Sequence, residues 1–251
     1  MSRIQRLGLI GGTGLNHWGQ TVRMHELEST YGPPSAAVAE FQVAGLQVFF
    51  LPRHGAGHNI PPHAINYRAN IDILRQVEVD GIIAVNAVGG IAGHCPPGTL
   101  CLPDQLIDYT WGRVHSFSMS ADDDLQHVDF THPFSAQLRT GLIHAAGQAK
   151  LEVTRTGCLG VMQGPRLETA TEIQRLARDG CDLVGMTNMP EAALAREAAL
   201  EYACLCVVAN NAAGLDDEPL SMAGITSTLA SVMLNVRKLL TAFFEELCNG
   251  R

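Results

Sequence analysis

Short apolar runs alternate along this chain with longer segments in which apolar residues recur every three or four positions. A short run that is apolar throughout predicts a strand covered on both faces of a sheet. We therefore expect strands at residues 7–10, 46–51, 81–85, 99–102, 157–162, 182–186 and 202–209. The three-and-four spacing predicts helices at residues 64–79, 135–150, 168–178, 191–199 and 221–247.

The last of these helices has the clearest pattern. Its apolar residues are Met222, Ile225, Leu229, Val232, Val236, Leu239, Phe243 and Leu247. Ser221 stands where an N-cap is expected. The helix at 191–199 follows Pro190, and proline is favoured in the first turn of a helix.

The alternation of strands and helices predicts an α/β fold: a single domain over residues 1–251, with a central mixed β-sheet flanked by helices on both faces. A length of 251 residues, 46% of them hydrophobic, allows a sizeable core. The segment 113–133 reads as a long, polar, His-rich loop. Loops of this length are usually functional or lie at an interface.

Charge and composition narrow the choice of partners and location. A formal net charge of -8 argues against nucleic acid, because binding its phosphates requires basic surface. No apolar run is long enough to span a membrane, and the first residues lack the features of a signal peptide. Seven cysteines without a Cys-x-x-Cys pair argue against a structural zinc site and favour buried thiols. We therefore expect a cytoplasmic protein.

Polar and glycine-rich sequences follow several of the predicted strands. In an open α/β sheet, ligands bind outside the carboxyl ends of the strands. The residues expected at this edge are Thr13, Arg53, Asn86, Thr187 and Asn210. Arginine suits bidentate contact with phosphate, and the backbone N–H groups of a turn such as 11–14 can hold an oxyanion.

Two other uses of these motifs are disfavoured. The glycines at 11–14 do not complete a dinucleotide-binding fingerprint, because Asn16 and His17 stand where its third glycine should fall. His54, His58 and His63 raise the question of a metal site. Glycines and prolines among them predict a loop, so these histidines share no helix face, and we expect no metal.

Glu168 and Asn210, each just after a predicted strand, are suited to reading the edge of a 6-oxopurine. A carboxylate accepts a hydrogen bond from N1–H, and a carboxamide donates to O6 and accepts from a protonated N7. Both residue types are also common on exposed loops, so this pair alone leaves a purely structural interpretation open.

Several motifs in order resemble the trimeric purine nucleoside phosphorylases, and most closely their 5'-methylthioadenosine phosphorylase branch. They are Gly11-Gly12-Thr13-Gly14-Leu15, Arg53-His54-Gly55, Asn66-Tyr67-Arg68-Ala69-Asn70-Ile71, Gly164-Pro165-Arg166 and Met189-Pro190-Glu191-Ala192. The resemblance covers residues 7–247. It implies a homotrimer that cleaves a purine ribonucleoside with inorganic phosphate as co-substrate and with no metal or organic cofactor.

The resemblance also assigns roles by position. Phosphate would be held by Thr13, Arg53, His54, Asn86, Ala87 and Thr187. Met186 would lie against the ribose and Leu167 against the purine, and His127 would reach the site of a neighbouring subunit. The family more often has phenylalanine at the position of Leu167, so we expect weaker stacking here.

The chain departs from the methylthioadenosine branch at the base. That branch typically ends the strand after Tyr202 in Asp-x-Asp and has serine at the position of Glu168, whereas this chain has Asn210, Asn211 and Ala212. Glutamate with asparagine is the pattern of the 6-oxopurine phosphorylases. Adenine N1 is a bare acceptor, and facing it with an ionised Glu168 costs about 1–3 kcal/mol.

The residues expected near the 5' position of the sugar distinguish inosine from methylthioinosine as the substrate. Inosine phosphorylases of this family have a histidine near the 5'-hydroxyl, where this chain has Met222, with Ile225 on the same helix face. Apolar side chains suit a methylthio group, although both residues also fit the core stripe of their helix. We therefore predict phosphorolysis of S-methyl-5'-thioinosine, with Asn210, Glu168 and His54 as the catalytic residues.

Four alternatives stay open. In the same class they are a 5'-methylthioadenosine phosphorylase or a general 6-oxopurine nucleoside phosphorylase. A nucleoside-binding protein without catalysis is disfavoured because a purine binder needs no phosphate site. A dinucleotide-dependent oxidoreductase is disfavoured by the incomplete glycine fingerprint.

Overall fold

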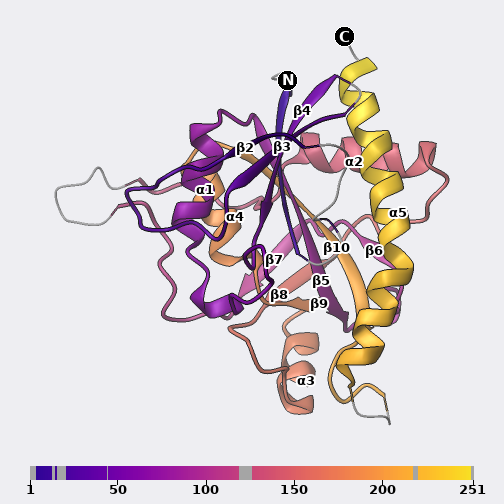
Figure 1. Ribbon diagram of the computed structural model, residues 1–251. Coiled ribbons are helices and arrows are strands. Elements are labelled where there is room, and N and C mark those ends of the chain that lie inside the picture. The colour runs from indigo at the N-terminus through magenta and orange to yellow at the C-terminus, as the bar shows by residue number, and fades with distance from the viewer. Residues whose placement is uncertain are drawn as a thin grey trace.

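Ten strands form one sheet in the computed structural model, which describes residues 4–12, 15, 21–43, 45–118, 126–216 and 220–249 (Figure 1). The strands are β1 (Arg6–Gly11), β2 (Thr21–His25), β3 (Val38–Val43), β4 (Leu46–Pro52), β5 (Gly81–Gly90), β6 (Leu100–Cys101), β7 (Gln105–Asp108), β8 (Cys158–Val161), β9 (Leu183–Gly185) and β10 (Glu201–Asn211). The helices are a 3-10 turn (Pro62–Ala64), α1 (Tyr67–Gln76), α2 (Ala136–Gln148), α3 (Ala170–Arg178), α4 (Asn188–Glu197) and α5 (Met222–Asn249).

The sheet is mixed, as the sequence predicts. Its order is β2-β3-β4-β1-β5-β9-β8-β7, and β10 pairs with β5 and β6. The pairs β4–β1, β1–β5 and β5–β10 are parallel, so these four strands bring their carboxyl ends to one edge. The pairs β2–β3, β3–β4, β5–β9 and β6–β10 are antiparallel.

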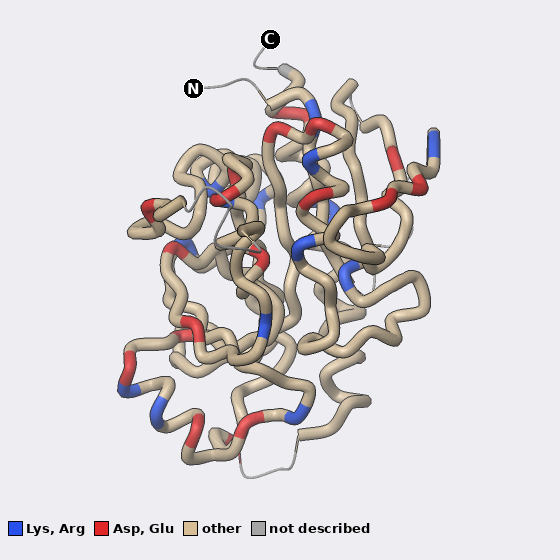
Figure 2. Tube along the Cα trace, turned by 90° about the vertical axis from the view of Figure 1, so that its left-hand side faces the viewer, with Lys and Arg blue, Asp and Glu red and all other residues tan. Residues whose placement is uncertain are grey.

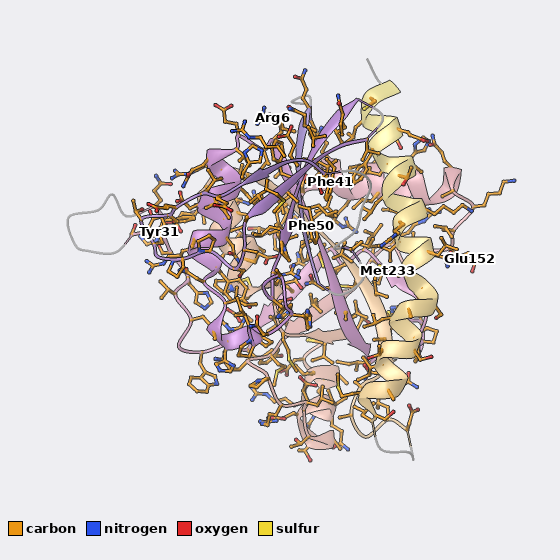
Figure 3. All side chains as sticks on the ribbon, in the orientation of Figure 1. Arg6, Tyr31, Phe41, Phe50, Glu152 and Met233 are labelled. Carbon is orange, nitrogen blue, oxygen red and sulfur yellow. The ribbon has the colours of Figure 1, made fainter. Side chains whose placement is uncertain are left out.

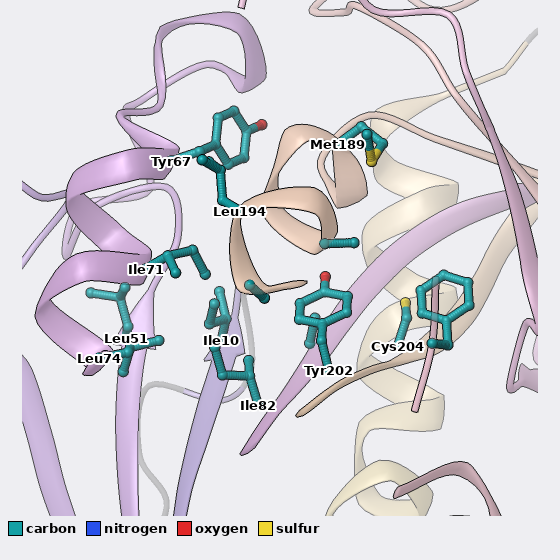
Figure 4. Close-up of a cluster of buried hydrophobic side chains, with 14 of the residues drawn as sticks. Ile10, Leu51, Tyr67, Ile71, Leu74, Ile82, Met189, Leu194, Tyr202 and Cys204 are labelled. Carbon is teal, nitrogen blue, oxygen red and sulfur yellow. The ribbon is translucent and has the colours of Figure 1, made fainter. Parts of the chain in front are cut away.

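Helices cover both faces of the sheet, and each face has its own apolar cluster. Alternate residues of β5 divide between them: Ile82 packs on the side of α1 and α4, whereas Ile83 packs on the side of α2 and α5. Figure 4 shows the first cluster, where Ile71 and Leu194 lie close to Ile10. The predicted two-faced α/β architecture is therefore confirmed.

The second cluster lies beneath α5. Phe41 and Phe50, labelled in Figure 3, belong to it, and Met233 of α5 packs against it. Further along the same helix, Val236 and Phe243 are buried. The packed length of α5 fixes the helix on the sheet, while its first turns are exposed (Figure 1). No helix in the described ranges is long and apolar enough to cross a bilayer.

The sequence pattern missed three strands. β2 is an edge strand whose apolar residues Val22 and Met24 are exposed, and β3 alternates apolar with polar residues. β7 is the short strand at the other edge. The edge strands β2 and β7 bury at most one face, and β3, which lies between β2 and β4, has exposed and partly exposed positions among its buried ones, so all three lack the continuous apolar run that marks the central strands.

Local signals explain where the helices begin. Asn66, Ser135 and Thr169 are N-caps whose side chains accept from backbone N–H groups of α1, α2 and α3, and Glu172 completes a capping box with Thr169. Acidic and basic residues are interspersed along the chain in Figure 2.

Candidate functional site

Three of the polar residues that the sequence predicts for phosphate come from strands of the same sheet. Arg53 directly follows β4, Asn86 lies inside β5, and Thr187 follows β9 at the start of α4. The predicted common carboxyl edge is wrong for Thr187, because β9 runs antiparallel to β5, and Asn86 lies four residues before the end of β5. All three are buried polar residues. Thr13 lies outside the described residues. A set of polar side chains inside an apolar core needs partners, and those partners define the site.

Arg53 forms a bidentate ion pair with Glu191 of α4. Its Nε and Nη2 donate to the two carboxylate oxygens at 2.7 and 2.8 Å, and the two side chains are 2% and 0% exposed. Burial by itself lowers the pKa of Arg53, but the attraction and hydrogen bonds of Glu191 outweigh it and hold that pKa above its usual value. The guanidinium is therefore a permanent cation in a fixed orientation.

A chain of hydrogen bonds continues from this pair. The Tyr202 hydroxyl donates to Glu191 at 2.8 Å, Asn188 donates to the Tyr202 hydroxyl at 3.1 Å, and Asn86 donates to Asn188. Burial, together with the charge of Glu191, raises the pKa of Tyr202 well above its ordinary value, so Tyr202 stays protonated. The network leaves the buried Oδ1 atom of Asn86 without a hydrogen-bond partner.

Unused N–H groups of Arg53 and an exposed residue of β5 would allow an anion to bind beside this network. Arg53 uses Nε, one N–H of Nη2 and one of Nη1, the last towards the Val85 carbonyl at 3.3 Å. Within the described part of the chain this leaves one N–H on each Nη atom without a partner, since a guanidinium has five donors. Ala87 is exposed although every other residue of β5 is buried, so the backbone next to Asn86 is accessible.

Thr187 is the third polar residue predicted to bind phosphate together with Arg53 and Asn86. It is the N-cap residue of α4 and is 7% exposed, and its side chain makes no capping hydrogen bond. Because Met189 is not helical and interrupts the first turn of α4, Thr187 offers an anion its own hydroxyl and backbone N–H rather than a regular helix N-terminus. Thr187, Arg53 and Asn86 together form a site of the right polarity for phosphate.

His54 is held in one neutral tautomer. Its Nδ1 lies 2.8 Å from the carbonyl oxygen of Ile60, and a carbonyl only accepts, so Nδ1 carries the proton. Burial is the main cause that lowers the pKa of His54 from 6.5 to about 4. At neutral pH its Nε2 is therefore an acceptor, suited to the hydroxyl of a hydrogen phosphate ion. The ring lies 4.7 Å from that of His58, and a Cβ at Gly12 would approach both.

Asn210 lies at the end of β10 against Gly89 of β5. A side chain at Gly89 would stand 3.1 Å from Val184 and 3.5 Å from the amide nitrogen of Asn210, so glycine keeps this place open. The Asn210 amide donates one N–H to the carbonyl of Asn211 at 2.6 Å, which orients the group and leaves its second N–H for a ligand.

Glu168 comes from the segment before α3, and the structure packs this segment against the one that follows Asn210. A Cβ at Gly214 would stand 2.4 Å from the Cβ of Ala170, and Ala212 shares an apolar cluster with Ile173 of α3. Burial raises the pKa of Glu168 above its ordinary value. The two residues predicted to read the base therefore come from segments in direct contact.

A cavity of about 290 Å³ opens beside Glu168. It is lined by Tyr109, Trp111, Met162, Gln163, Gly164, Arg166, Glu168, Glu172, Arg175 and Leu176. Arg53, Asn86 and Asn210 do not line it, so the structure does not bring Glu168 and Asn210 together in this cavity. The exposed Arg166 and Glu172 pair across its rim with two contacts of 2.8 Å.

Met186 connects the base and phosphate regions. A Cβ at Gly164 would stand 2.6 Å from the Met186 sulfur, so the segment before Glu168 packs tightly on the residue before Thr187. Gly164 has a φ of +61°, a conformation that glycine adopts without strain. Leu167, predicted to lie against the purine, is 41% exposed.

The residues predicted to contact the 5' group, and the one predicted to reach a neighbouring subunit, have exposed or partly exposed side chains in the single chain. Met222 is 68% exposed and Ile225 is partly buried. The alternative that Met222 belongs to the core stripe is therefore wrong, because the first turns of α5 extend past the sheet. His127 is exposed, and among the residues that the structure describes no hydrogen bond links it to the other site residues.

Sequence reasoning missed the side chains that hold the site together. Glu191, Asn188 and Tyr202 position Arg53 and Asn86, and Arg113 binds the segments that carry Glu168 and Thr187. One signal was available: Glu191 stands next to Pro190 at a helix start, where a carboxylate inside an apolar segment needs a cation. No local pattern identifies Arg113, whose partners are 46 to 76 residues away.

The chain resembles a known protein family, several of its members and solved structures. The family model described as "Phosphorylase superfamily" matches residues 6–245. A probable S-methyl-5'-thioinosine phosphorylase from Xanthomonas campestris is 51% identical over 226 residues, 89% of this chain and 90% of the relative. A probable 6-oxopurine nucleoside phosphorylase from Thermococcus kodakarensis is 36% identical over 96% of this chain and 92% of the relative. Methylthioadenosine phosphorylase from Schistosoma mansoni, solved with adenine, superposes with a TM-score of 0.91 at 30% identity, over 98% of this chain and 92% of that one.

Proposed function

The chain belongs to the phosphorylase superfamily, and we propose that it catalyses the phosphorolysis of S-methyl-5'-thioinosine to hypoxanthine and 5-methylthioribose 1-phosphate. The observation that carries the choice of base is the contact between the segments of Glu168 and Asn210 at Ala170 and Gly214. A carboxylate and a carboxamide carried by segments in contact match the N1–H and O6 of a 6-oxopurine. The Xanthomonas relative, which carries the same substrate in its name, supports the proposal.

The reaction begins at the phosphate end. Phosphate binds the two free N–H groups of Arg53, with Thr187 and Ala87 beside it and Nε2 of His54 accepting from its hydroxyl. One phosphate oxygen attacks C1' of the sugar as the bond from C1' to N9 of the purine breaks. Positioning of the two reactants supplies much of the acceleration.

The base end stabilises the leaving group. Negative charge builds on the purine as its bond to C1' breaks, and Asn210 donates to O6 and accepts from a protonated N7. This is electrostatic stabilisation where charge develops in the transition state. Glu168 accepts N1–H and so orients the base, Leu167 lies against the purine and Met186 lies against the ribose.

We also propose that the outer end is completed in a homotrimer that works in the cytoplasm without a metal or organic cofactor. Leu167 and Met222 are exposed in the single chain, and His127 would approach a neighbouring subunit's site. Met222 and Ile225 offer apolar contact to a 5'-methylthio group. The seven free cysteines suit a reducing compartment.

A panel of nucleosides with inorganic phosphate tests the proposal. Methylthioinosine is expected to exceed methylthioadenosine in kcat/KM by about tenfold or more, because one mispaired polar edge costs at least about 1.4 kcal/mol. Equal or faster cleavage of methylthioadenosine would overturn the choice of base. Release of free base without phosphate, or no release at all, would overturn the assignment as a phosphorylase.

Two further measurements separate the remaining parts of the proposal. A general 6-oxopurine nucleoside phosphorylase is the second candidate, favoured by the Thermococcus relative, and it would cleave inosine as well as methylthioinosine. Activity unchanged by a chelator is expected if no metal takes part. Light scattering during size-exclusion chromatography gives the number of subunits, and three are expected.

A further inference from the structure

Arg113 lies where three segments of the candidate site meet. Its Nε donates to Oε1 of Gln163 at 3.1 Å, and its Nη2 donates to the Gln163 carbonyl at 2.7 Å. Its Nη1 donates to the carbonyls of Met186, at 2.9 Å, and Met189, and to the Tyr67 hydroxyl at 3.2 Å. Among the described ion pairs none involves Arg113, so its partners are carbonyl, amide and hydroxyl oxygens.

The contacts to Gln163 hold the segment that leads to Glu168. The Gln163 side chain also accepts from the backbone N–H of Trp111 at 3.2 Å, so Gln163 is bound to the Arg113 segment in three places. The next residue, Gly164, packs against Met186 with no room for a Cβ. The position of this segment, and of Glu168 at its end, therefore depends on Arg113.

The contacts to Met186 and Met189 hold the turn that carries the phosphate residues. Met189 is extended, with φ −119° and ψ 134°, inside the first turn of α4. A carbonyl in that conformation leaves the helical hydrogen-bond pattern, and Arg113 binds it instead. Thr187 and Asn188 lie between the two bound carbonyls, and Glu191, the partner of Arg53, follows two residues later.

We propose that Arg113 is a positioning residue that sets the base-reading segment and the phosphate turn relative to each other. The proposal rests on the proposed function only for the identity of the nucleoside. A planar guanidinium reaches acceptors on both sides at once, whereas the ammonium of a lysine is a single point with three donors. The same side chain binding both segments means that its loss alters both ends of the site together.

The test compares Arg113→Lys with Arg139→Lys. Arg139 is a matched control because it too donates to backbone carbonyls: those of Pro103 at 2.9 Å, Leu102 at 3.2 Å and Arg155 at 2.6 Å. These partners do not belong to the candidate site. Both replacements keep the charge and remove the guanidinium fork, so both are expected to lower the melting temperature.

The two variants are expected to differ in kinetics. Arg113→Lys should lower kcat/KM by about 10- to 100-fold, raise the phosphate KM and reduce the preference for methylthioinosine over methylthioadenosine, since small misplacements of reacting groups have effects of this size. Arg139→Lys should leave the phosphate KM and the base preference within about twofold of wild type. A phosphate KM and base preference unchanged in Arg113→Lys would overturn the proposal.

Gln163→Ala removes the side-chain contacts on the base side alone. It should reduce the base preference while the phosphate KM stays near that of wild type, and equal changes in both quantities would contradict the two-sided role of Arg113. If the wild type instead prefers another purine nucleoside, the choice of substrate fails. The Arg113 comparison is then made with that nucleoside and still decides the positioning role.

Discussion

Two arginine–glutamate pairs with nearly the same geometry stand in very different surroundings. Arg53 and Glu191 meet through two hydrogen bonds at 2.7 and 2.8 Å with almost no exposed surface, whereas Arg166 and Glu172 meet through two at 2.8 Å with side chains 67% and 31% exposed. The buried pair fixes the arginine of the phosphate site. The exposed pair lies at the rim beside Glu168. In the proposed mechanism, the arginine that binds phosphate is therefore held in the core, whereas the pair near the predicted base-reading residue lies at the surface.

The largest expected effect comes from breaking the buried pair. Glu191→Gln places an amide N–H against Arg53 and leaves its charge uncompensated, which is expected to lower the free energy of unfolding by about 3–5 kcal/mol. Chemical denaturation measures this loss. Glu172→Gln is the matched control: it makes the same chemical change in the exposed pair, and glutamine can keep the capping box. If both variants lost a similar free energy of unfolding, burial would not distinguish the two pairs.

Asn210→Asp tests whether base choice can be altered without loss of stability. A carboxylate accepts from a 6-amino group but cannot donate to O6, so the preference should move towards methylthioadenosine by about tenfold, or about 1.4 kcal/mol. Kinetics with both nucleosides measures the shift. Asn235→Asp makes the same change on an exposed face of α5 and is expected to leave the preference as it is. A uniform loss on both nucleosides would show that Asn210 does not discriminate.

The buried end of the site also predicts a pH dependence of stability. Because the pKa of His54 is lowered to about 4, the folded protein keeps this ring neutral while the unfolded chain takes up a proton below pH 6.5. This contribution to stability is present above pH 6.5 and is lost as the pH falls towards 4. His54→Asn, which cannot titrate, should reduce the slope of the melting temperature over this window. A slope in His54→Asn equal to that of the wild type would contradict the prediction.

The smallest effect is expected at the outermost residue. Met222→His should favour inosine over methylthioinosine by about 1 kcal/mol, because a polar side chain replaces apolar contact to the methylthio group. Since Met222 is 68% exposed, the melting temperature should not change. Leu234→His, at a 74% exposed position on α5, is the control for introducing a histidine. A nucleoside ratio that is the same in both variants would place Met222 outside the 5' pocket.

The sequence by itself determined the fold class, and it predicted that the substrate site lies at the carboxyl ends of the central strands. Central strands such as β1 and β10 are buried on both faces, so their apolar runs are continuous and visible in the sequence. Residues directly after such strands, Arg53 among them, reach the carboxyl edge by the geometry of the parallel sheet. Glu168 and Asn210 were identified because their chemistry departs from a family pattern at single positions.

Only the tertiary structure decided which partners hold these residues in place. Arg53 and Glu191 are 138 residues apart, and Arg113 meets Met186 across 73 residues, so no local spacing contains either contact. The tertiary structure also decided that Met222 is exposed. The spacing of apolar residues along α5 continues beyond the point where the sheet beneath the helix ends. Periodicity reports which face of a helix is apolar, whereas burial depends on what the rest of the chain places against that face.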